Sequence, residues 1–209
     1  MRFSRFLVCA TLTASLLLAG CGQQAPSVVE STPAPTPTAT PAPTPIPTVD
    51  IATKGGYPEV GDVLGSISIP GTEVDCTLYW GDAPTQLDQG AGIYPEAKMP
   101  GQPGTILVAA HTHTYFADLK SIEVGDEIVI STYYGDYRYR IVDAQVAQET
   151  DTSAYDLTKE EQNIILYTCY PFGTLSRTTQ RYFVYGEYVD GPAVIDSSAQ
   201  SASENSASA

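Results

Sequence analysis

The chain has 209 residues and a formal net charge of −14 at pH 7, with 10 basic residues against 24 acidic ones. An acidic chain repels phosphate backbones, so we expect no nucleic-acid partner. The acidic residues do not follow the spacing of a calcium-binding loop, and we expect neither a metal nor another cofactor.

The N-terminal segment has the form of a secretory signal. A short basic start is followed by an apolar stretch, residues 6–18, that is too short to span a membrane. It ends in Leu18-Ala19-Gly20-Cys21, which resembles a bacterial lipobox, where the cysteine is acylated and becomes the first mature residue. We therefore expect residues 1–20 to be a lipoprotein signal peptide. Cys21 would carry the lipid anchor, at the extracytoplasmic face of the cell membrane, facing the cell wall.

The segments on either side of the central region have compositions that do not favour a packed core. Residues 21–56 are expected to be a linker, because eight prolines between positions 26 and 47 alternate mostly with Thr and Ala, which is typical of extended polyproline II. Residues 191–209 are rich in Ser and Ala and are expected to be a disordered tail. This leaves residues 57–190 as one domain, long enough for a sizeable core.

Apolar and alternating segments predict a mainly β domain. Seven segments have the length and pattern of strands: 63–69, 74–79, 105–110, 127–132, 137–146, 163–169 and 181–189. Thr158 and Glu161 form a capping-box pattern that predicts one or two helical turns, and residues 115–120 can form a second short helix. An exported domain with this many strands favours a closed, mostly antiparallel barrel, which leaves no free strand edge.

Two cysteines, Cys76 and Cys169, fall within the expected domain. Outside the cell they could form a disulfide. Cys169, however, ends one predicted strand and Arg181 begins the next, so pairing of these strands would place a thiol beside a guanidinium. A nearby cation favours the reactive thiolate, and arginine can stabilise a carbonyl oxygen that gains negative charge.

Two histidines, His111 and His113, are the only ones in the chain, and they follow the apolar run of residues 105–110. A spacing of two places both on one side of an extended segment, so the spacing does not select between them. One histidine cluster, one candidate nucleophile and one arginine are the minimum set for cysteine-dependent acyl transfer. Three alternatives remain. One is a cysteine hydrolase on the same fold, and a second is a different cysteine peptidase, which the absence of a Cys-Gly-Ser-Cys-Trp motif disfavours. The third is a lipid-anchored, non-catalytic cell-wall binding module in which Cys76 and Cys169 form a disulfide.

Several of these segments together resemble the sortases, cysteine transpeptidases of Gram-positive surfaces. Residues 165–169, Ile-Leu-Tyr-Thr-Cys, are similar to the family's Thr-Leu-X-Thr-Cys motif, and residues 181–184, Arg-Tyr-Phe-Val, to its Arg-X-X-Val strand. Residues 110–116 are similar to the family's histidine block, and the resemblance covers nearly all of residues 60–189. Ile165 replaces the first Thr of the motif, and Ala110 replaces the Gly before the histidine.

The resemblance implies an eight-stranded barrel and a peptidase or transpeptidase reaction. Cys169 would attack a peptide carbonyl in an LPXTG-like sorting signal of a surface protein, Arg181 would stabilise the oxyanion, and His111 would protonate the departing amine. The resulting thioester would be resolved by an amine acceptor, either a lipid II-type peptide or a pilin lysine.

The register with the family selects among the remaining candidates. It favours His111 over His113. Arg181 is preferred over Arg177, because Arg177 lies in the loop before the last strand. Thr168 and Ala110, which flank the proposed catalytic residues, are expected to contact the substrate.

Overall fold

The computed structural model describes residues 45–199. The predicted signal peptide, Cys21 and most of the predicted linker therefore lie outside the described residues. Within the described range, no helix combines the length and the apolar character that a membrane span requires.

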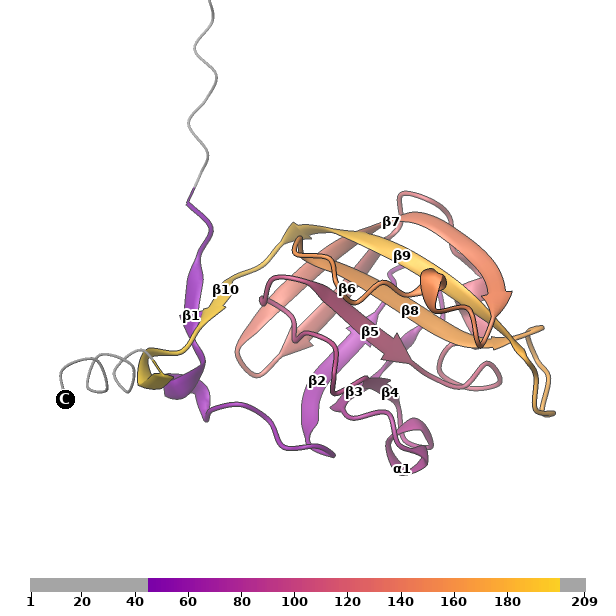
Figure 1. Ribbon diagram of the computed structural model, residues 1–209, viewed down its shortest axis with the longest axis horizontal. Helices are drawn as coiled ribbons and strands as arrows, with labels where there is room; N and C mark the ends of the chain where they lie inside the picture. Colours follow the sequence, from indigo (N-terminus) through magenta and orange to yellow (C-terminus); the bar gives the residue numbers. More distant parts are fainter. Residues whose placement is uncertain (1–44, 200–209) are drawn as a thin grey trace, which may run out of the picture. The chain divides into compact units, whose positions relative to one another are not determined.

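Eight strands close into a barrel in the order β2-β3-β4-β5-β8-β9-β7-β6 (Figure 1). Their bounds are β2 Val63–Ser68, β3 Asp75–Trp80, β4 Ala91–Ile93, β5 Thr105–Ala109, β6 Glu127–Thr132, β7 Gly135–Gln148, β8 Asn163–Tyr170 and β9 Gln180–Asp190. Neighbouring strands are antiparallel except in two pairs, β3 with β4 and β5 with β8, which are parallel. The expected mainly β fold, a closed and mostly antiparallel eight-stranded barrel, is confirmed.

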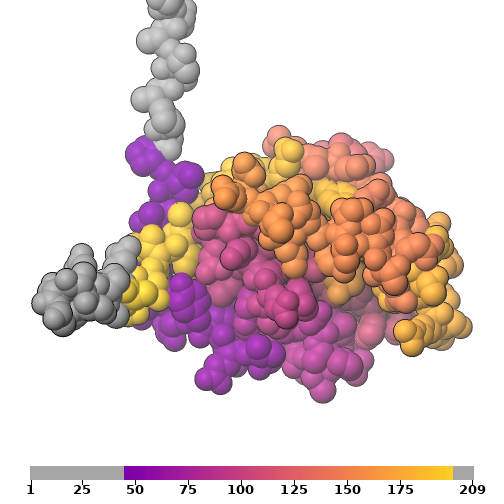
Figure 2. All heavy atoms as spheres, in the orientation of Figure 1, coloured from indigo at the N-terminus to yellow at the C-terminus, as the bar shows by residue number. Residues whose placement is uncertain are grey.

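The strands bury one set of alternate residues inside the barrel and a second, smaller set outside it. Ile106, Leu166 and Val184 belong to the large core cluster. Their chain neighbours Leu107, Ile165 and Phe183 form a second cluster with Ala97 and Ala154. Because successive side chains of a strand point to opposite faces, the second cluster covers the outer face of β5, β8 and β9. Figure 2 shows the connection between β7 and β8, coloured orange, lying over the outer surface of the barrel.

The helical elements are short: α1 Pro84–Leu87, and the 3-10 helices η1 Ile51–Lys54, η2 Ala117–Ser121 and η3 Thr152–Ala154. Element η2 lies close to the helix predicted at 115–120. The helix predicted from Thr158 is wrong. The backbone N–H and the hydroxyl of Thr158 both donate to Asp156 Oδ1, at 2.8 and 2.6 Å. Thr158 therefore lies in a turn that the Asp156 side chain stabilises.

Two further strands lie outside the range 57–190. Strands β1 (Thr48–Asp50) and β10 (Ala193–Ile195) pair in parallel and lie side by side in Figure 1. Ile51, directly after β1, is fully buried in the main core, against which Val49 and Val194 also pack. Regular structure therefore reaches into both segments that were expected to be linker and tail, because each carries apolar residues that join the core.

Candidate active site

Cys169 and Arg181 lie directly opposite each other on the antiparallel strands β8 and β9. Residues in this relation have Cβ atoms about 5 Å apart and side chains on the same face. The predicted pairing of these two strands is confirmed. The two cysteines within residues 45–199 are both free: Cys169 is partly exposed, whereas Cys76 is buried in β3. The disulfide that the non-catalytic alternative required is absent.

The two cysteines differ in their surroundings. Burial raises the pKa of the Cys76 thiol to about 11, so this group stays protonated at neutral pH. Because the thiolate is the nucleophilic form, Cys76 is a core residue rather than a reactive one. Cys169 is therefore the candidate nucleophile of the described residues.

Two hydrogen bonds join the segment that follows β5 to strand β8, next to the proposed catalytic residues His111 and Cys169. The Ala110 N–H donates to the carbonyl oxygen of Tyr167 at 3.4 Å, and the Thr168 hydroxyl donates to the carbonyl oxygen of Ala110 at 2.7 Å. His111 directly follows Ala110, just past the end of β5, and Cys169 directly follows Thr168 within β8. Thr168 and Ala110 are only 2% and 5% exposed. The contact that the structure shows for them is with each other, and a substrate contact for either stays a prediction.

His111 lies beside the end of α1. Its Nε2 is 3.5 Å from Asp88 Oδ1, and its ring stacks on His113 with centroids 5.2 Å apart. The His111 side chain is 34% exposed and the Asp88 side chain 73%. No hydrogen bond joins His111 to Cys169 in the described part of the chain. The sequence did not point to Asp88, because α1 has four residues, too few for a helical pattern.

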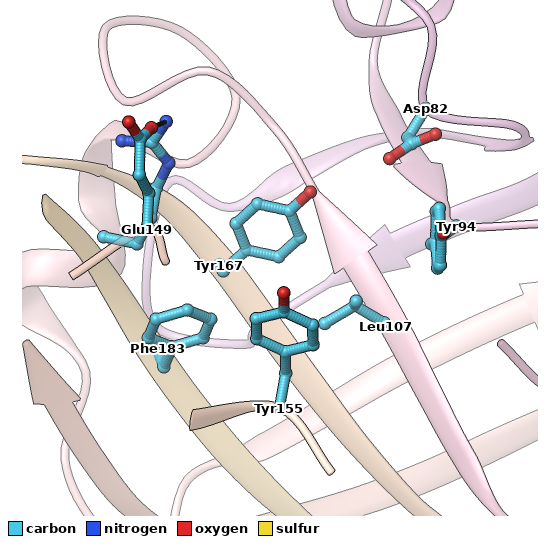
Figure 3. Close-up of a pocket in the computed structure, with 8 residues that line it drawn as sticks. Asp82, Tyr94, Leu107, Glu149, Tyr155, Tyr167 and Phe183 are labelled. Carbon is cyan, nitrogen blue, oxygen red and sulfur yellow. Dashed lines mark hydrogen bonds and ion pairs between the residues drawn. The ribbon is translucent and has the colours of Figure 1, made fainter. Parts of the chain in front are cut away.

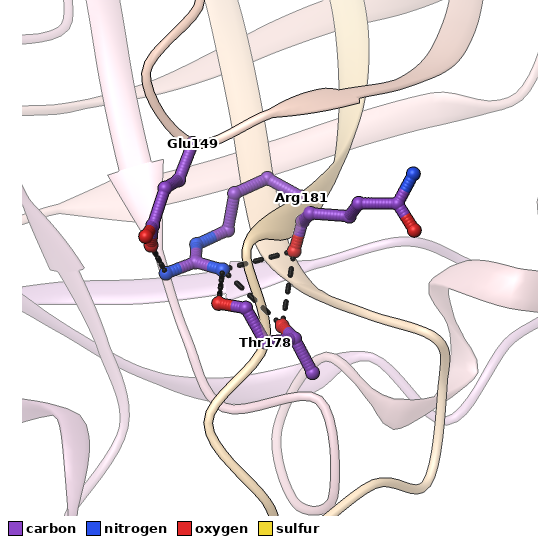
Figure 4. Close-up of polar contacts among 4 residues, drawn as sticks. Glu149, Thr178 and Arg181 are labelled. Carbon is purple, nitrogen blue, oxygen red and sulfur yellow. Dashed lines mark hydrogen bonds and ion pairs between the residues drawn. The ribbon is translucent and has the colours of Figure 1, made fainter.

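The guanidinium of Arg181 is held at the end of β7 and in the loop before β9 (Figure 4). Nη2 donates to Glu149 Oε2 at 2.6 Å, and Nη1 donates to the carbonyl oxygens of Thr178 and Gln180, each at 2.9 Å. The side chains of Arg181 and Glu149 are 19% and 27% exposed. Arg177 lies exposed in the same loop and forms no salt bridge within residues 45–199. Glu149 was not identified from the sequence, because it follows a long strand with no motif around it.

A pocket of about 390 Å³ adjoins this arrangement on the outer face of the barrel (Figure 3). It is lined by Asp82, Tyr94, Leu107, Glu149, Tyr155, Tyr167, Arg181 and Phe183. Neither Cys169 nor His111 lines it, but Tyr167 precedes Cys169 by two residues and shares its face of β8. The pocket therefore leads up to the paired Cys169 and Arg181.

Aromatic rings form the floor of this pocket. Phe183 stacks against both Tyr155 and Tyr167, with centroid distances of 6.1 and 5.8 Å. Burial, together with the nearby charge of Asp82, raises the pKa of Tyr167 to about 12. Burial also raises the pKa of Asp82 above its usual range. Within the described residues, no three His, Cys, Asp or Glu side chains gather closely enough to hold a metal ion.

Comparison with known proteins agrees with this architecture. The family described as "Sortase domain" matches residues 67–189. Sortase D of Bacillus subtilis (strain 168) is 32% identical over 132 residues, which cover 63% of this chain and 67% of that protein. The X-ray structure of sortase C from Clostridium perfringens SM101 is 28% identical, with a TM-score of 0.56 over 63% of this chain and 72% of that one. The X-ray structure of a Clostridium perfringens sortase C with the C-terminal cell wall sorting motif is 27% identical, with a TM-score of 0.57 over 63% of this chain and 73% of that one.

Proposed function

The chain belongs to the sortase family of cysteine transpeptidases, and we propose on that premise that it cleaves an LPXTG-like sorting signal and transfers it to an amine. The observation that carries this proposal is the position of a free, partly exposed Cys169 opposite Arg181, beside a pocket on the outer face of the barrel. A solved relative, sortase C of Clostridium perfringens, has been seen with a cell wall sorting motif, which supports a peptide ligand of this kind.

The first half of the reaction forms a thioester. The Cys169 thiolate attacks the carbonyl carbon of the scissile peptide bond, and the carbonyl oxygen becomes an oxyanion that accepts hydrogen bonds from Arg181. His111, as imidazolium, gives its proton to the nitrogen of the departing amine as the carbon–nitrogen bond breaks. The acyl part of the substrate stays on the Cys169 sulfur.

The second half releases the thioester. An acceptor amine attacks the same carbonyl carbon, His111 takes a proton from the attacking nitrogen, and the sulfur leaves as thiolate. We propose a lipid II-type peptide or a pilin lysine as the acceptor. If water attacks instead, the product is a free carboxylate and the protein is a hydrolase on the same fold.

The setting of this reaction is also a proposal. An acylated Cys21 would anchor the chain to the membrane, and residues 21–56 would carry the catalytic domain on the extracytoplasmic side, toward the cell wall. These residues up to position 44 lie outside the described range. Support comes from the lipobox-like sequence, and mass spectrometry of the membrane fraction tests it: a chain that still begins at Met1, or lacks lipid, contradicts the anchor.

The test of the activity uses the soluble chain that follows Cys21, incubated with a library of fluorescent sorting peptides with and without an added amine. We expect cleavage in both cases, and a ligated product, identified by its mass, when the amine is present. Cys169→Ala should abolish both reactions while the circular dichroism spectrum stays unchanged. Cleavage that survives Cys169→Ala would contradict the proposal, and release of the free acid alone in the presence of amine would favour the hydrolase.

A further inference from the structure

Asp82 is the carboxylate of the pocket that lacks a cationic partner. Two carboxylates line the pocket, and Glu149 is paired with Arg181 at 2.6 Å. Asp82 forms no salt bridge with any residue in the range 45–199. Its pKa is raised because burial removes water from the carboxylate, and only a hydrogen bond from its own backbone offsets this. A positive charge placed beside Asp82 would relieve that unfavourable burial.

Tyrosine rings line the same pocket as this carboxylate. In Figure 3, Asp82 and Tyr94 lie on one side of Tyr167, and Glu149 lies on the other. Asp82, Tyr94 and Tyr167 line the same pocket, and the charge of Asp82 contributes to the raised pKa of both tyrosines. Tyrosine faces attract cations, and they do so more strongly when a carboxylate is near and water is partly excluded.

The balance of charge in the pocket is negative. Arg181 supplies one positive charge, and Glu149 already neutralises it. Asp82 remains, and the negative charge of Glu96, which is not itself a lining residue, also raises the pKa of Tyr94. An anionic side chain would be repelled here, and a neutral one would leave Asp82 without a partner.

From these contacts we infer that the pocket binds a cationic side chain, lysine or arginine, of a substrate peptide, which lies against the tyrosine rings and pairs with Asp82. The inference rests on the proposed function, because it assigns a preference to the peptide that the same site would process. Two peptides take part in that reaction, the sorting signal and the acceptor. Either can carry the cation, so the experiment treats them separately.

The measurement is peptide binding, which needs no turnover. The Cys169→Ala chain is titrated with Leu-Pro-X-Thr-Gly peptides in which X or a neighbouring position is Lys, Gln or Glu, and fluorescence anisotropy gives each Kd. We expect the best Lys peptide to bind about fivefold more tightly than its Gln counterpart, as for one partly exposed ion pair with a cation–π contact. The Glu peptide should bind more weakly than the Gln peptide.

A series of variants tests whether Asp82 is the group that favours the Lys peptide over the Gln peptide. Adding Asp82→Asn should bring the ratio of Lys to Gln affinities close to one. Asp75→Asn is the matched control: it makes the same change in net charge at an exposed position at the start of β3, outside the pocket. With that control the ratio should stay at its original value. Tyr155→Leu should lower the ratio, whereas Tyr155→Phe, which keeps the ring, should retain most of it.

The acceptor series repeats the comparison with oligoglycine peptides in which one residue is Lys, Gln or Glu. A Lys preference that is seen here, and that Asp82→Asn removes, assigns the cation to the acceptor. Equal affinities for Lys and Gln peptides in both series, no binding of any peptide, or a Lys preference that Asp82→Asn leaves intact would each overturn the inference. A different result would contradict the proposed function: the wild-type chain would show no Cys169-dependent cleavage of any peptide.

Discussion

Glu149 and Arg181 form the shortest salt bridge in the described part of the chain, with 2.6 Å between Glu149 Oε2 and Arg181 Nη2. Nη1 donates to Thr178 and to the Gln180 carbonyl. These bonds hold the guanidinium, but within residues 45–199 the Nε–H and the second N–H of Nη2 have no hydrogen-bond partner. A substrate carbonyl can therefore accept a hydrogen bond from Arg181 while the salt bridge to Glu149 stays in place.

The salt bridge between Glu149 and Arg181 should contribute measurably to stability. Glu149→Ala leaves a partly buried guanidinium without its anionic partner, and we expect a loss of about 1–2 kcal/mol in the free energy of unfolding. Urea denaturation measures it. The matched comparison is Asp190→Ala, which breaks the more exposed pair between Arg138 and Asp190 and should cost less than about 1 kcal/mol. Equal losses of unfolding free energy in the two variants would show that partial burial does not strengthen the salt bridge between Glu149 and Arg181.

The hydroxyl of Thr168 should matter for both stability and activity. Thr168→Val keeps the shape of the side chain but leaves the Ala110 carbonyl without its 2.7 Å hydrogen bond, and we expect a loss of about 1–2 kcal/mol. Because this bond fixes the residues just before His111 and Cys169, kcat/KM should fall by about 10- to 100-fold. Thr168→Ser is the control and should retain most of both. If Thr168→Val is destabilised but keeps full activity, this hydrogen bond is not needed to position His111 and Cys169.

The two histidines should differ sharply when each is removed. His111→Ala is expected to lower kcat/KM by about 100-fold or more, because it removes the general acid, whereas His113→Ala should have little effect. The rate of the wild type should follow a bell-shaped pH profile, since one reacting group must be deprotonated and the other protonated. Peptide cleavage measured across the pH range provides both tests. A profile that stays flat from acid to alkali would argue against His111 as the proton donor.

The folded state should lose stability at alkaline pH. Burial raises the pKa of Cys76 to about 11 and that of Tyr167 to about 12, and it also raises the pKa of Tyr134, Tyr137 and Tyr139. In the unfolded chain these groups ionise near their ordinary values of about 8.5 and 10. Between the two sets of values the folded chain binds more protons, so its stability falls as pH rises. The stabilising contribution is complete below about pH 8 and falls by up to about 1.4 kcal/mol per pH unit for each group above its unfolded pKa.

Thermal unfolding between pH 7 and 11, followed together with tyrosinate absorbance, measures this effect. Tyr139→Phe should reduce the dependence of Tm on alkaline pH. Its own cost should be small, because within residues 45–199 the Tyr139 hydroxyl has no hydrogen-bond partner. Tyr57→Phe, at an exposed position, is the control and should behave like the wild type. A Tm that is constant from pH 7 to 11 would contradict the assignment of these groups as buried and neutral.

The sequence was sufficient to predict the strands that contain a long, continuous apolar or alternating pattern. Runs such as residues 163–169 and 181–189 predicted β8 and β9 and their pairing, and this placed Cys169 beside Arg181. Strand β4 has three residues, Ala91–Ile93, and is too short to show a period. Strands β1 and β10 are equally short, and each pairs with a strand at the other end of the sequence and packs against the main core.

The details of the candidate site depended on contacts that no local pattern encodes. A capping-box pattern at Thr158 predicted a helix, but the Thr158 hydroxyl and N–H instead donate hydrogen bonds to Asp156, and the segment forms a turn. Glu149 meets Arg181 from 32 residues away, and Asp82 reaches the pocket from the end of another strand. Such partners follow from the register of the closed barrel, which is known only once all eight strands are placed.

The parallel pairing of β5 with β8 has a consequence for how this fold can diversify. The ends of the two strands are joined by a hydrogen bond between residues 58 positions apart, and the chain between them contains β6 and β7, which pair elsewhere in the barrel, together with the loops that connect them. The spacing of the imidazole and the sulfur is therefore independent of the length of the intervening connections. Insertions, deletions or exchanges in those connections can remodel substrate recognition while the reacting pair keeps its geometry.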